Sequence, residues 1–352
     1  MRALVLSGGE GSRLRPITHT NAKQLIPVAG RPILFHALEA IRDAGITEVG
    51  IVVGATAEEV RAAVGDGSAW GLRVTYVPQA APLGLAHAVL AAQSFVAGQP
   101  FLMYLGDNVL LEGVSRFVEE FERVRPDAQI FLARVPEPER FGVAVLEGDR
   151  VVKLAEKPKE HLSDLALVGV YLFDDSILEA AAAIEPSGRG ELEITDAIQW
   201  LIDHGKTVRA QMVSGWWKDT GKPEDLLEAN RMMLSGLASD VQGEVDAAST
   251  LGGTVILGSG AKVIRSSITG PVAIGPDSVI EDSRVGPEVS IERDCRVTRS
   301  SLEDSIVMEG CVIADVLGLT GSILGKNVEV RHSGAVGARR LVVGDQSKVE
   351  VD

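Results

Sequence analysis

The stretch that decides the fold lies near the start of the chain and reads Leu4-Val5-Leu6-Ser7-Gly8-Gly9-Glu10-Gly11-Ser12-Arg13-Leu14. An apolar run here leads directly into a glycine-rich loop. Such a loop after a β-strand presents backbone N–H groups to an anion, because glycine has no Cβ to block close approach. The loop departs from the dinucleotide fingerprint, which needs a third glycine at Leu14, and from the P-loop, which needs Gly-Lys-Ser/Thr. The sequence therefore predicts a phosphate-binding loop of another kind.

The charge of this region points the same way. Residues 1–31 carry a net charge of +4 from five cations and one acid, Glu10, whereas the whole chain carries −15. Local fields matter more than net charge where a cleft must hold a polyanion. Arg13 closes the glycine-rich loop and Lys23 follows ten residues later, a pair that suits a triphosphate. From charge alone, a solvated basic edge remains the alternative.

The first 215 residues alternate short apolar runs with helical periods. This alternation predicts a doubly wound α/β domain with a Rossmann-like sheet. Two alternating runs flank a turn at 147–150, which predicts a hairpin over 142–154 and hence a mixed sheet. Strands are expected at 3–6, 49–53, 74–77, 101–105, 130–133, 168–173 and 208–213. Helices are expected at 32–45, 58–64, 84–95, 114–124, 194–202 and 223–234.

The last hundred residues follow a different rule. Ile268, Ile274 and Ile280 recur every six residues, and a second series follows with the same spacing at Val285, Ile291 and Val297. A six-residue apolar repeat with small residues between predicts a parallel β-helix, whereas a β-sandwich would need period-two alternation and hairpin turns. The register slips by one between the two series, which predicts a shortened corner. We expect domains at 1–240 and 241–352, with a linker over 235–246.

Composition excludes several classes of protein. The two cysteines, Cys295 and Cys311, are too few for a disulfide framework, which predicts a reducing, cytoplasmic setting. The sequence has no apolar run of about 20 residues, so we expect no membrane-spanning helix. The acidic balance and the aromatic content of 4% disfavour a nucleic-acid partner.

Further motifs, in order along the first ~230 residues, identify the chain as resembling the sugar nucleotidyltransferase family. They are Gly8-Gly9-x-Gly11-x-Arg13-Leu14, Lys23-Gln24-Leu25-Ile26-Pro27, Pro82-Leu83-Gly84-Leu85-Ala86, Leu105-Gly106-Asp107-Asn108, Arg140-Phe141-Gly142-Val143, Glu156-Lys157-Pro158, Gly190-Glu191-Leu192-Glu193-Ile194-Thr195-Asp196 and Trp217-Lys218-Asp219-Thr220-Gly221. Within the family, they are most similar to members that transfer a thymidylyl group from dTTP to glucose 1-phosphate. The repeats resemble the left-handed parallel β-helix of hexapeptide repeats in the long form of these enzymes. One departure is Ser7, where the family usually has alanine.

The resemblance also implies roles for particular residues. It implies that Asp107 and Asp219 hold Mg²⁺, and that Arg13, Lys23, Asp107 and Lys157 carry the catalysis. The implied nucleotide-binding residues are Leu6, Gly8, Gly9, Gly11, Arg13, Lys23, Gln79, Pro82, Gly84 and Asp107. The implied sugar-phosphate-binding residues are Asn108, Gly142, Glu156, Lys157, Val168, Gly169, Arg189 and Glu191.

Three alternatives stay open. Thymine and uracil differ by one methyl group, so UTP or another sugar 1-phosphate could be the substrate. The repeats could carry an acyltransferase, although this chemistry usually needs a histidine and they contain only His332; we expect a structural or oligomerisation module in a homo-oligomer. The first domain could also sense nucleotides without turnover, but Asp107, Lys157 and Asp219 argue against that.

Overall fold

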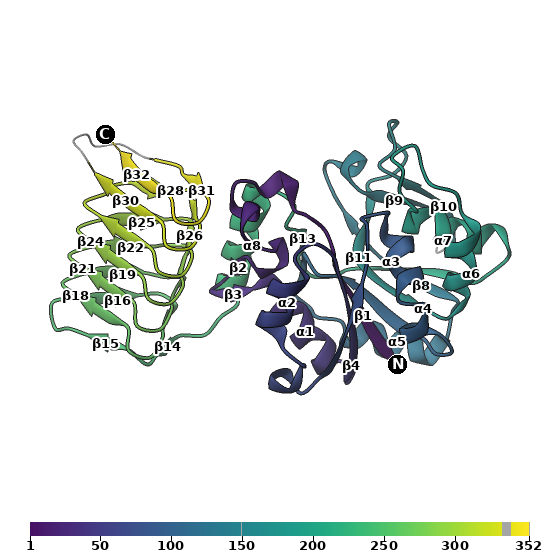
Figure 1. Ribbon diagram of the computed structural model, residues 1–352, viewed down its shortest axis with the longest axis horizontal. Coiled ribbons are helices and arrows are strands. Elements are labelled where there is room, and N and C mark those ends of the chain that lie inside the picture. The colour runs from purple at the N-terminus through teal and green to yellow at the C-terminus, as the bar shows by residue number, and fades with distance from the viewer. Residues whose placement is uncertain (149, 333–338, 352) are drawn as a thin grey trace. The chain divides into compact units, whose positions relative to one another are not determined.

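The computed structural model describes residues 1–148, 150–332 and 339–351 (Figure 1). The chain forms two compact units. Met1–Glu10 and Leu34–Asp219 make up the first, which we call the sheet unit, and Gly11–Ile33 and Thr220–Asp352 make up the second, the β-helix unit. The boundary expected at residue 240 follows the change of sequence pattern and stays a prediction. Grouping by contacts assigns two further segments, 11–33 and 220–239, to the β-helix unit.

The sheet unit is built on one nine-stranded mixed sheet, as the sequence predicted. Its strand order is β5-β4-β1-β6-β11-β8-β12-β10-β9. The first four strands in this order are mutually parallel, and β11 runs antiparallel to β6. The bounds are β1 Arg2–Ser7, β4 Glu48–Val53, β5 Arg73–Pro78, β6 Phe101–Leu105, β8 Ala128–Arg134, β9 Gly142–Glu147, β10 Arg150–Glu156, β11 Leu165–Phe173 and β12 Val208–Met212. Each expected strand lies on one of these, and its ends differ from the observed bounds by three residues at most, the largest difference being at the start of β11.

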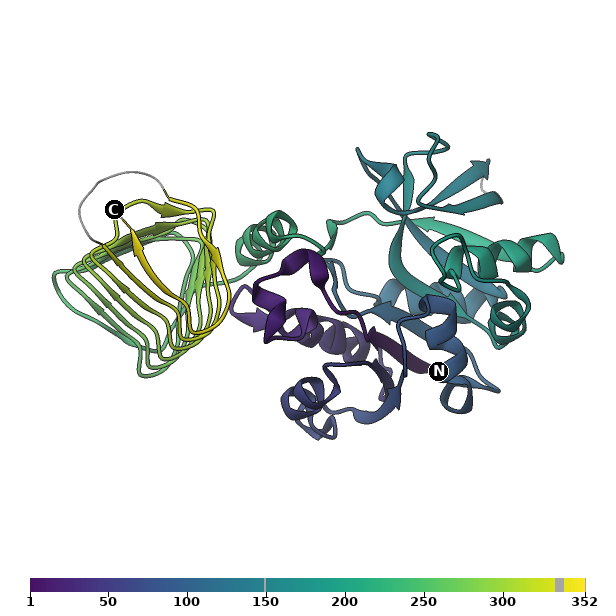
Figure 2. The same ribbon diagram turned by 45° about the horizontal axis from the view of Figure 1, so that its top comes forward.

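Helices lie on both sides of this sheet (Figures 1 and 2). On one side, Val89, Ile177 and Ile198 from three helices share a buried cluster with Met103 of β6. On the other, Phe117 packs on Phe131 of β8, with ring centroids 4.2 Å apart. Both faces of the strands are therefore buried, which is why their sequences read as continuous apolar runs. The helices are α1 Ile33–Asp43, α2 Ala57–Val64, α3 Leu85–Ala91, α4 Gln93–Val96, α5 Ser115–Val124, α6 Ser176–Ala183 and α7 Ile194–Asp203.

Two expectations about helices need correction. The helix expected over 84–95 is interrupted at Ala92, which separates α3 from α4. Helix α6 had no counterpart among the expected helices, because its run of alanines shows little amphipathic contrast. None of the helices in the described residues has both the length and the apolar character that crossing a membrane requires.

The carboxyl-terminal repeats form a parallel β-helix, as predicted. Three sheets of parallel strands are stacked coil upon coil (Figure 2). Val255 pairs with Val272 and Val272 with Val289, so one coil takes 17 residues, from 255 to 272 and from 272 to 289. The strands are β14 Asp240–Val241, β15 Glu244–Val245, β16 Thr250–Gly252, β17 Val255–Leu257, β18 Lys262–Ile264, β19 Ser267–Thr269, β20 Val272–Ile274, β21 Val279–Glu281, β22 Arg284–Val285, β23 Val289–Ile291, β24 Arg296–Thr298, β25 Ser301–Glu303, β26 Ser305–Val307, β27 Val312–Ala314, β28 Leu319–Thr320, β29 Ile323–Leu324, β30 Glu329–His332, β31 Val342–Val343 and β32 Lys348–Val351.

The register slip in the sequence corresponds to a two-residue corner that recurs in three successive coils, between β18 and β19, β21 and β22, and β24 and β25. Only Asp282 and Ser283 separate β21 from β22, and Arg299 and Ser300 occupy the same place one coil later. Asp282 and Arg299 adopt positive φ angles of 50° and 47°. Two spacings of six residues and one of five therefore complete each 17-residue coil. The linker expected over 235–246 is largely ordered, because β14 and β15 already belong to the first coil.

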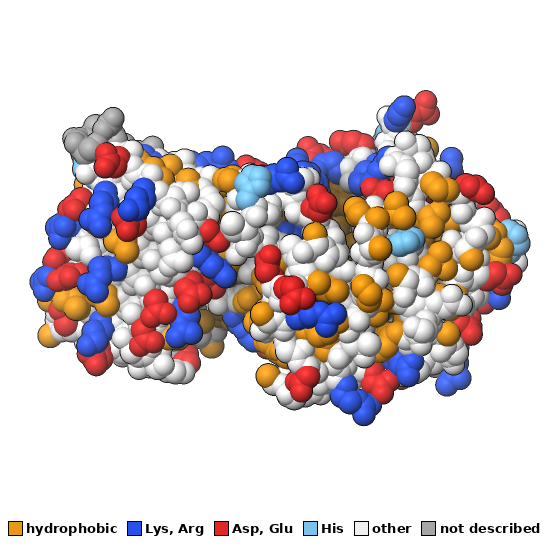
Figure 3. Space-filling model, in the orientation of Figure 1, with side chains coloured by type: hydrophobic (Ala, Val, Ile, Leu, Met, Phe, Trp, Pro, Cys, Tyr) orange, Lys and Arg blue, Asp and Glu red, His pale blue; other side chains and the backbone are white. Residues whose placement is uncertain are grey.

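Paired charges cover the outside of the coils, and buried polar groups line the short corner. Arg265 bonds Asp282 at 2.7 Å and Arg299 bonds Asp315 at 2.6 Å. Figure 3 shows acidic and basic side chains mixed over the β-helix part of the surface. Both cysteines are free and buried, as expected of small core residues.

A ladder of serine hydroxyls runs up the short corner. The Ser283 hydroxyl accepts a hydrogen bond from the Ser300 N–H at 3.0 Å and donates one to the Glu281 carbonyl at 2.7 Å. Ser283→Ala should lower the free energy of unfolding by about 1–3 kcal/mol, because a buried N–H loses its acceptor. Urea unfolding monitored by circular dichroism measures this loss. The exposed Ser259→Ala is the matched control, and equal midpoints for the two variants would contradict the prediction.

Candidate active site

The carboxyl ends of two adjacent parallel strands bring the glycine-rich loop and Asp107 to the same edge of the sheet. Leu6 of β1 lies opposite Leu105 of β6, and the Gly106 N–H bonds the Leu6 carbonyl at 2.9 Å. Gly8 follows one strand and Asp107 the other. Ligands of open α/β sheets bind at this edge, in the crevice outside the carboxyl ends of the strands.

A short antiparallel ladder places Asp219 beside Asp107. Strand β7 (Asn108–Leu110) pairs with β13 (Trp217–Asp219), and Asp219 lies directly opposite Asn108. Directly opposed Cα atoms of such a ladder are about 4.5–5.5 Å apart. Asp107, one residue before Asn108, is therefore a near neighbour of Asp219, although 112 positions separate them in the chain, from 107 to 219. Both carboxylates are half-buried.

The side chain of Asn108 connects these groups to the neighbouring strand β11. Its amide donates a hydrogen bond to Asp107 at 3.0 Å and its oxygen accepts one from the Trp217 indole at 2.6 Å. Gly169 faces it across a bulge in β11 and has a φ of 65°. A Cβ on Gly169 would lie 2.9 Å from the Asn108 amide, so only glycine fits here. Val168, beside it, is fully buried.

The residues implied for base recognition form a second group. The Gln79 amide nitrogen lies 3.2 Å from the Gly84 carbonyl and 3.0 Å from His87 Nδ1. A Cβ on Gly8 would lie 3.1 Å from the Gln79 amide oxygen. Gln79, Gly84 and Gly8 therefore lie together, and their role in binding the base stays a prediction. Leu6 is buried, whereas Pro82 and Gly9 are exposed.

The residues implied for sugar-phosphate binding form a third group, around Arg189. Its guanidinium lies 3.2 Å from Glu156, 3.0 Å from Glu191 and 3.6 Å from Glu193. The Lys157 ammonium lies 3.5 Å from Glu156. At Gly142, opposite Glu156 in the ladder, a Cβ would lie 2.9 Å from the Glu156 carboxylate and 2.7 Å from the Thr195 methyl.

The electrostatics of this third group are dominated by its acids. Burial opposes the charged guanidinium, but the three surrounding carboxylates outweigh it and raise the pKa of Arg189. Burial raises the pKa of Glu193, against the hydrogen bond that this carboxylate accepts from Ser187. Burial, and then the Glu193 charge, raise the pKa of Asp196. Arg189 is therefore already held by carboxylates, while Lys157 keeps an exposed ammonium with one acidic neighbour.

Contacts within the sheet unit join the three groups into one site. The Trp217 indole, bonded to Asn108, packs edge-on against Phe141 with centroids 5.5 Å apart. The Phe141 carbonyl accepts the Lys157 N–H at 3.0 Å. The Leu192 N–H bonds the Leu83 carbonyl at 2.8 Å. This bond connects the base-recognition group to the segment that carries Glu191 and Glu193, the acids beside Arg189.

Four contributors to this site were not predicted as site residues. His87 lies against Gln79, Glu193 against Arg189, and the rings of Phe141 and Trp217 against each other. Glu193, Phe141 and Trp217 all lie inside the recognised motifs, so the signal was present in the sequence. His87 is on α3, three residues beyond Gly84, and only the structure brings it to the Gln79 amide.

The cations expected to bind the triphosphate fold with the β-helix unit, because the unit boundary crosses the glycine-rich loop between Glu10 and Gly11. Gly11 has a φ of 64° and begins a 3₁₀ turn, Ser12–Leu14, that carries the exposed Arg13. A later 3₁₀ turn, Lys23–Leu25, carries Lys23. A Cβ on Gly11 would lie 2.9 Å from Lys23 Cβ, and Thr18 donates to the Gly11 carbonyl at 2.8 Å. The segment is thus folded back on itself.

The departure at Ser7 has a structural cost. Ser7 is fully buried, and its hydroxyl finds no hydrogen-bond partner within the described part of the chain. A buried hydroxyl without a partner destabilises the folded state relative to alanine of similar size. The substitution is therefore tolerated rather than favourable.

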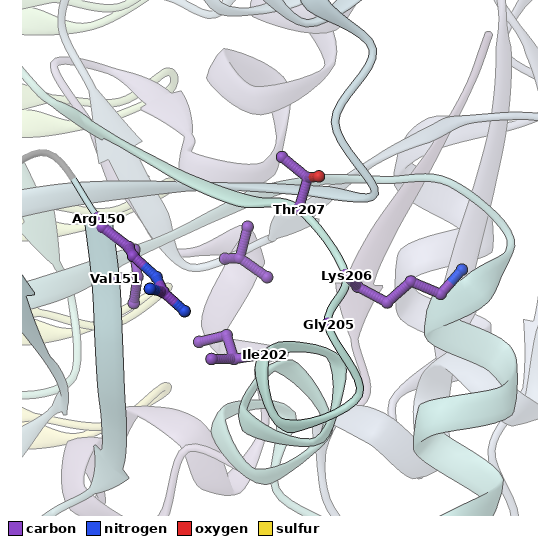
Figure 4. Close-up of a pocket in the computed structure, with 7 residues that line it drawn as sticks. Arg150, Val151, Ile202, Gly205, Lys206 and Thr207 are labelled. Carbon is purple, nitrogen blue, oxygen red and sulfur yellow. The ribbon is translucent and has the colours of Figure 1, made fainter.

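A pocket of about 290 Å³ lies elsewhere in the sheet unit (Figure 4). It is lined by Arg150, Val151, Ile202, Gly205, Lys206, Thr207 and Val208. None of these is a predicted site residue. In Figure 4 the Lys206 side chain extends away from Arg150, and its ammonium lies 3.3 Å from Asp127. This pocket is not the candidate active site.

The residues at the sheet edge suit a hard divalent cation. Asp107, immediately before β7, and Asp219, the last residue of β13, each bear a carboxylate, and the ladder brings their backbones close together. A group of three or more histidine, cysteine, aspartate or glutamate side chains suited to a metal is not found among residues 1–148, 150–332 and 339–351. Mg²⁺ is commonly held by only one or two carboxylates, with water and substrate phosphates completing its shell. The pair therefore fits such an ion.

Known proteins share both the sequence and the fold. The nucleotidyl transferase family model matches residues 2–236. A glucose-1-phosphate thymidylyltransferase of Streptomyces griseus is 53% identical over all of this chain and 99% of its own length, and one of Streptomyces antibioticus is 52% identical over the same shares.

Among solved structures, one titled a putative glucose-1-phosphate thymidylyltransferase from Bacillus anthracis, in complex with a sucrose, is 36% identical. It superimposes with a TM-score of 0.63 over 66% of this chain and 94% of its own. The family match covers the whole nine-stranded sheet and the motifs quoted above. The chain belongs to the nucleotidyl transferase family.

Proposed function

We propose that this protein is a glucose-1-phosphate thymidylyltransferase, which transfers a thymidylyl group from dTTP to α-D-glucose 1-phosphate and releases pyrophosphate. The observation that carries the proposal is the ladder that sets Asp219 opposite Asn108, at the strand ends where nucleotides bind. The two Streptomyces relatives that bear this name match the chain from end to end, which supports the same reaction.

The reaction depends more on neutralising negative charge than on a protein nucleophile or base. A phosphate oxygen of the sugar phosphate attacks the α-phosphorus of dTTP, the new P–O bond forms, and the bond to pyrophosphate breaks in line. The nucleophile is already an anion, so no protein base is required. The obstacle is repulsion between two polyanions, and catalysis then rests on positioning and neutralisation.

We assign Asp107 and Asp219 to a Mg²⁺ ion. When bound, the ion would neutralise triphosphate oxygens and orient the α-phosphate for attack. Asn108 holds the Asp107 carboxylate through a 3.0 Å hydrogen bond, and Trp217 holds Asn108 in turn. These contacts keep the Asp107 carboxylate in place. In this proposal Arg13 and Lys23 bind the triphosphate, the first as a planar fork and the second as a point charge.

We assign the sugar phosphate to the group around Arg189. Lys157 has one acidic neighbour and an exposed ammonium, which suits it to bind the phosphate. Arg189 already has three carboxylate neighbours, so we expect it to orient Glu156 and Glu191 toward the sugar hydroxyls as well as to contact the phosphate. Val168 and Gly169 would present backbone groups to the hexose, and Gly142 leaves room beside Glu156.

Gln79 and Gly84 are assigned to the base, with Gly8, Gly9 and Gly11 lining the triphosphate and Leu6 and Pro82 flanking the nucleotide. The Gln79 amide can donate and accept at a pyrimidine edge, and its contact with His87 would hold it in one orientation.

A cytoplasmic location and a homo-oligomer also remain predictions. The free cysteines are compatible with a reducing compartment.

Pyrophosphate release with Mg²⁺, glucose 1-phosphate and each triphosphate in turn tests the proposal. We expect turnover with dTTP, and a kcat/KM for UTP lower by roughly 10-fold or more but still measurable, because one methyl group in an apolar pocket is worth about 1–3 kcal/mol. Equal values for the two pyrimidines, or a preference for a purine, would overturn the thymidylyl assignment. Absence of turnover with every triphosphate would favour a sensing role instead.

A further inference from the structure

The last coil of the β-helix holds the segment that carries the two triphosphate cations. Asp345 lies between β31 and β32, in this coil. Its carboxylate accepts hydrogen bonds from Thr20 Oγ1 at 2.9 Å, from Asn21 Nδ2 at 3.0 Å and from the Lys326 N–H at 2.8 Å. Three donors from two distant parts of the chain therefore meet on one side chain.

The contacts around Asp345 hold its carboxylate and the Asn21 side chain in fixed positions. Asn21 is buried, and its amide nitrogen lies 3.0 Å from each Asp345 oxygen while also reaching the Ile17 carbonyl at 3.2 Å. A Cβ on the neighbouring Gly344 would lie 3.0 Å from the Pro16 carbonyl oxygen, so the coil and the segment also meet through their backbones. A carboxylate is matched to this place because every group facing it is a donor.

A second contact holds the other end of the same segment. The Ala29 N–H and the Ser290 hydroxyl both donate to the Asn230 side-chain oxygen at 2.8 Å. Asn230 is fully buried on helix α8 (Pro223–Ser235), and Ser290 belongs to β23 of the β-helix. Lys23 lies between the two attachment points, at Asn21 and at Ala29. Its backbone is thus held to the β-helix on both sides.

We infer that Asp345 is a positioning residue for the triphosphate cations, so that the β-helix contributes to dTTP binding through its contact with Thr20 and Asn21. The inference rests on the proposed function, which assigns Arg13 and Lys23 to the triphosphate. Arg13 lies on the turn before Pro16, and Lys23 lies two residues after Asn21. The repeats therefore act as more than an oligomerisation module, because their final coil sets the conformation of the loop.

The test is the steady-state kinetics of the full chain with Asp345→Ala, Asn21→Ala and the double variant. Each single change should raise KM for dTTP by roughly 10-fold to 100-fold, since small displacements of binding groups have effects of this size. KM for glucose 1-phosphate should stay the same. The double variant should be no worse than the more impaired single variant, because both single changes break the contact between Asn21 and Asp345. Asn21→Ala changes no residue of the repeats, and it keeps the bond from the Lys326 N–H to Asp345, so it guards against a folding defect of the last coil in Asp345→Ala.

Asp315→Ala is the matched control, because it removes a β-helix carboxylate that pairs with another residue of the coils, Arg299, at 2.6 Å. It should leave both KM values unchanged. An active wild type whose KM for dTTP is unaffected by either single change would overturn the inference and leave the proposed function standing. Equal rises in both KM values would also overturn it, since the contact would then support the fold as a whole. An inactive wild type would instead overturn the proposed function, and the inference with it.

Discussion

Replacement of Asp107 by asparagine should lower kcat for pyrophosphate release by at least about 100-fold, while the protein stays folded. The change removes the charge of one of the two carboxylates assigned to the ion, at the residue immediately before β7, where β7 pairs with β13. Asparagine is nearly isosteric, so the 3.0 Å contact with Asn108 can be replaced and the buried ladder keeps its packing. The loss therefore reports the negative charge rather than the shape of the side chain.

The measurement is kcat across a range of Mg²⁺ concentrations, together with thermal unfolding to check the fold. Asp43→Asn is the matched control, because Asp43 is exposed on helix α1 and its side chain pairs with that of its neighbour Arg42. Activity within a few-fold of wild type for Asp107→Asn would show that the ion is not held there. Partial recovery at high Mg²⁺ would agree with a weakened metal site.

Replacement of Lys157 by alanine should lower kcat/KM for glucose 1-phosphate by roughly 10-fold to 100-fold, with little change in KM for dTTP. A charge-assisted hydrogen bond to phosphate is worth about 1.5–3 kcal/mol, which corresponds to this range. Arg189 cannot readily take over, because Glu156, Glu191 and Glu193 already surround its guanidinium. Lys157 is therefore the cation of this group most available to an incoming phosphate.

Lys159→Ala is the control for this experiment. It removes an exposed lysine two positions further along the same loop, so it changes the net charge by the same amount. Both kinetic constants should stay close to wild type in this variant. Unchanged kcat/KM for glucose 1-phosphate in Lys157→Ala would show that the role taken over from the family does not apply at this position.

The carboxylates around Arg189 affect how the sugar phosphate is expected to lie in the site. The group around Arg189 holds more carboxylates than cations before substrate binds. A neutral sugar with hydroxyl donors suits such a surface, whereas a bare phosphate does not. We therefore expect the hexose ring to lie toward the glutamates and its phosphate toward Lys157.

Much of this protein follows from sequence alone. Buried parallel strands must be apolar on both faces, and six-residue spacings must form coils, so the runs at 3–6 and 101–105 and the series from Ile268 predicted both architectures. The same holds for the shortened corner, since a five-residue spacing leaves room for only two residues between strands. The motifs around Asp107 and Lys157 helped to identify the family.

Only the tertiary structure decided which residues far apart in the chain are in contact. No periodicity relates Asp219 to Asn108 or Asn21 to Asp345, because these pairs depend on strand register and on the stacking of coils. The assignment of 11–33 to the β-helix unit belongs here too. Local sequence determines which element a segment forms, whereas the register of its neighbours determines which side chains meet.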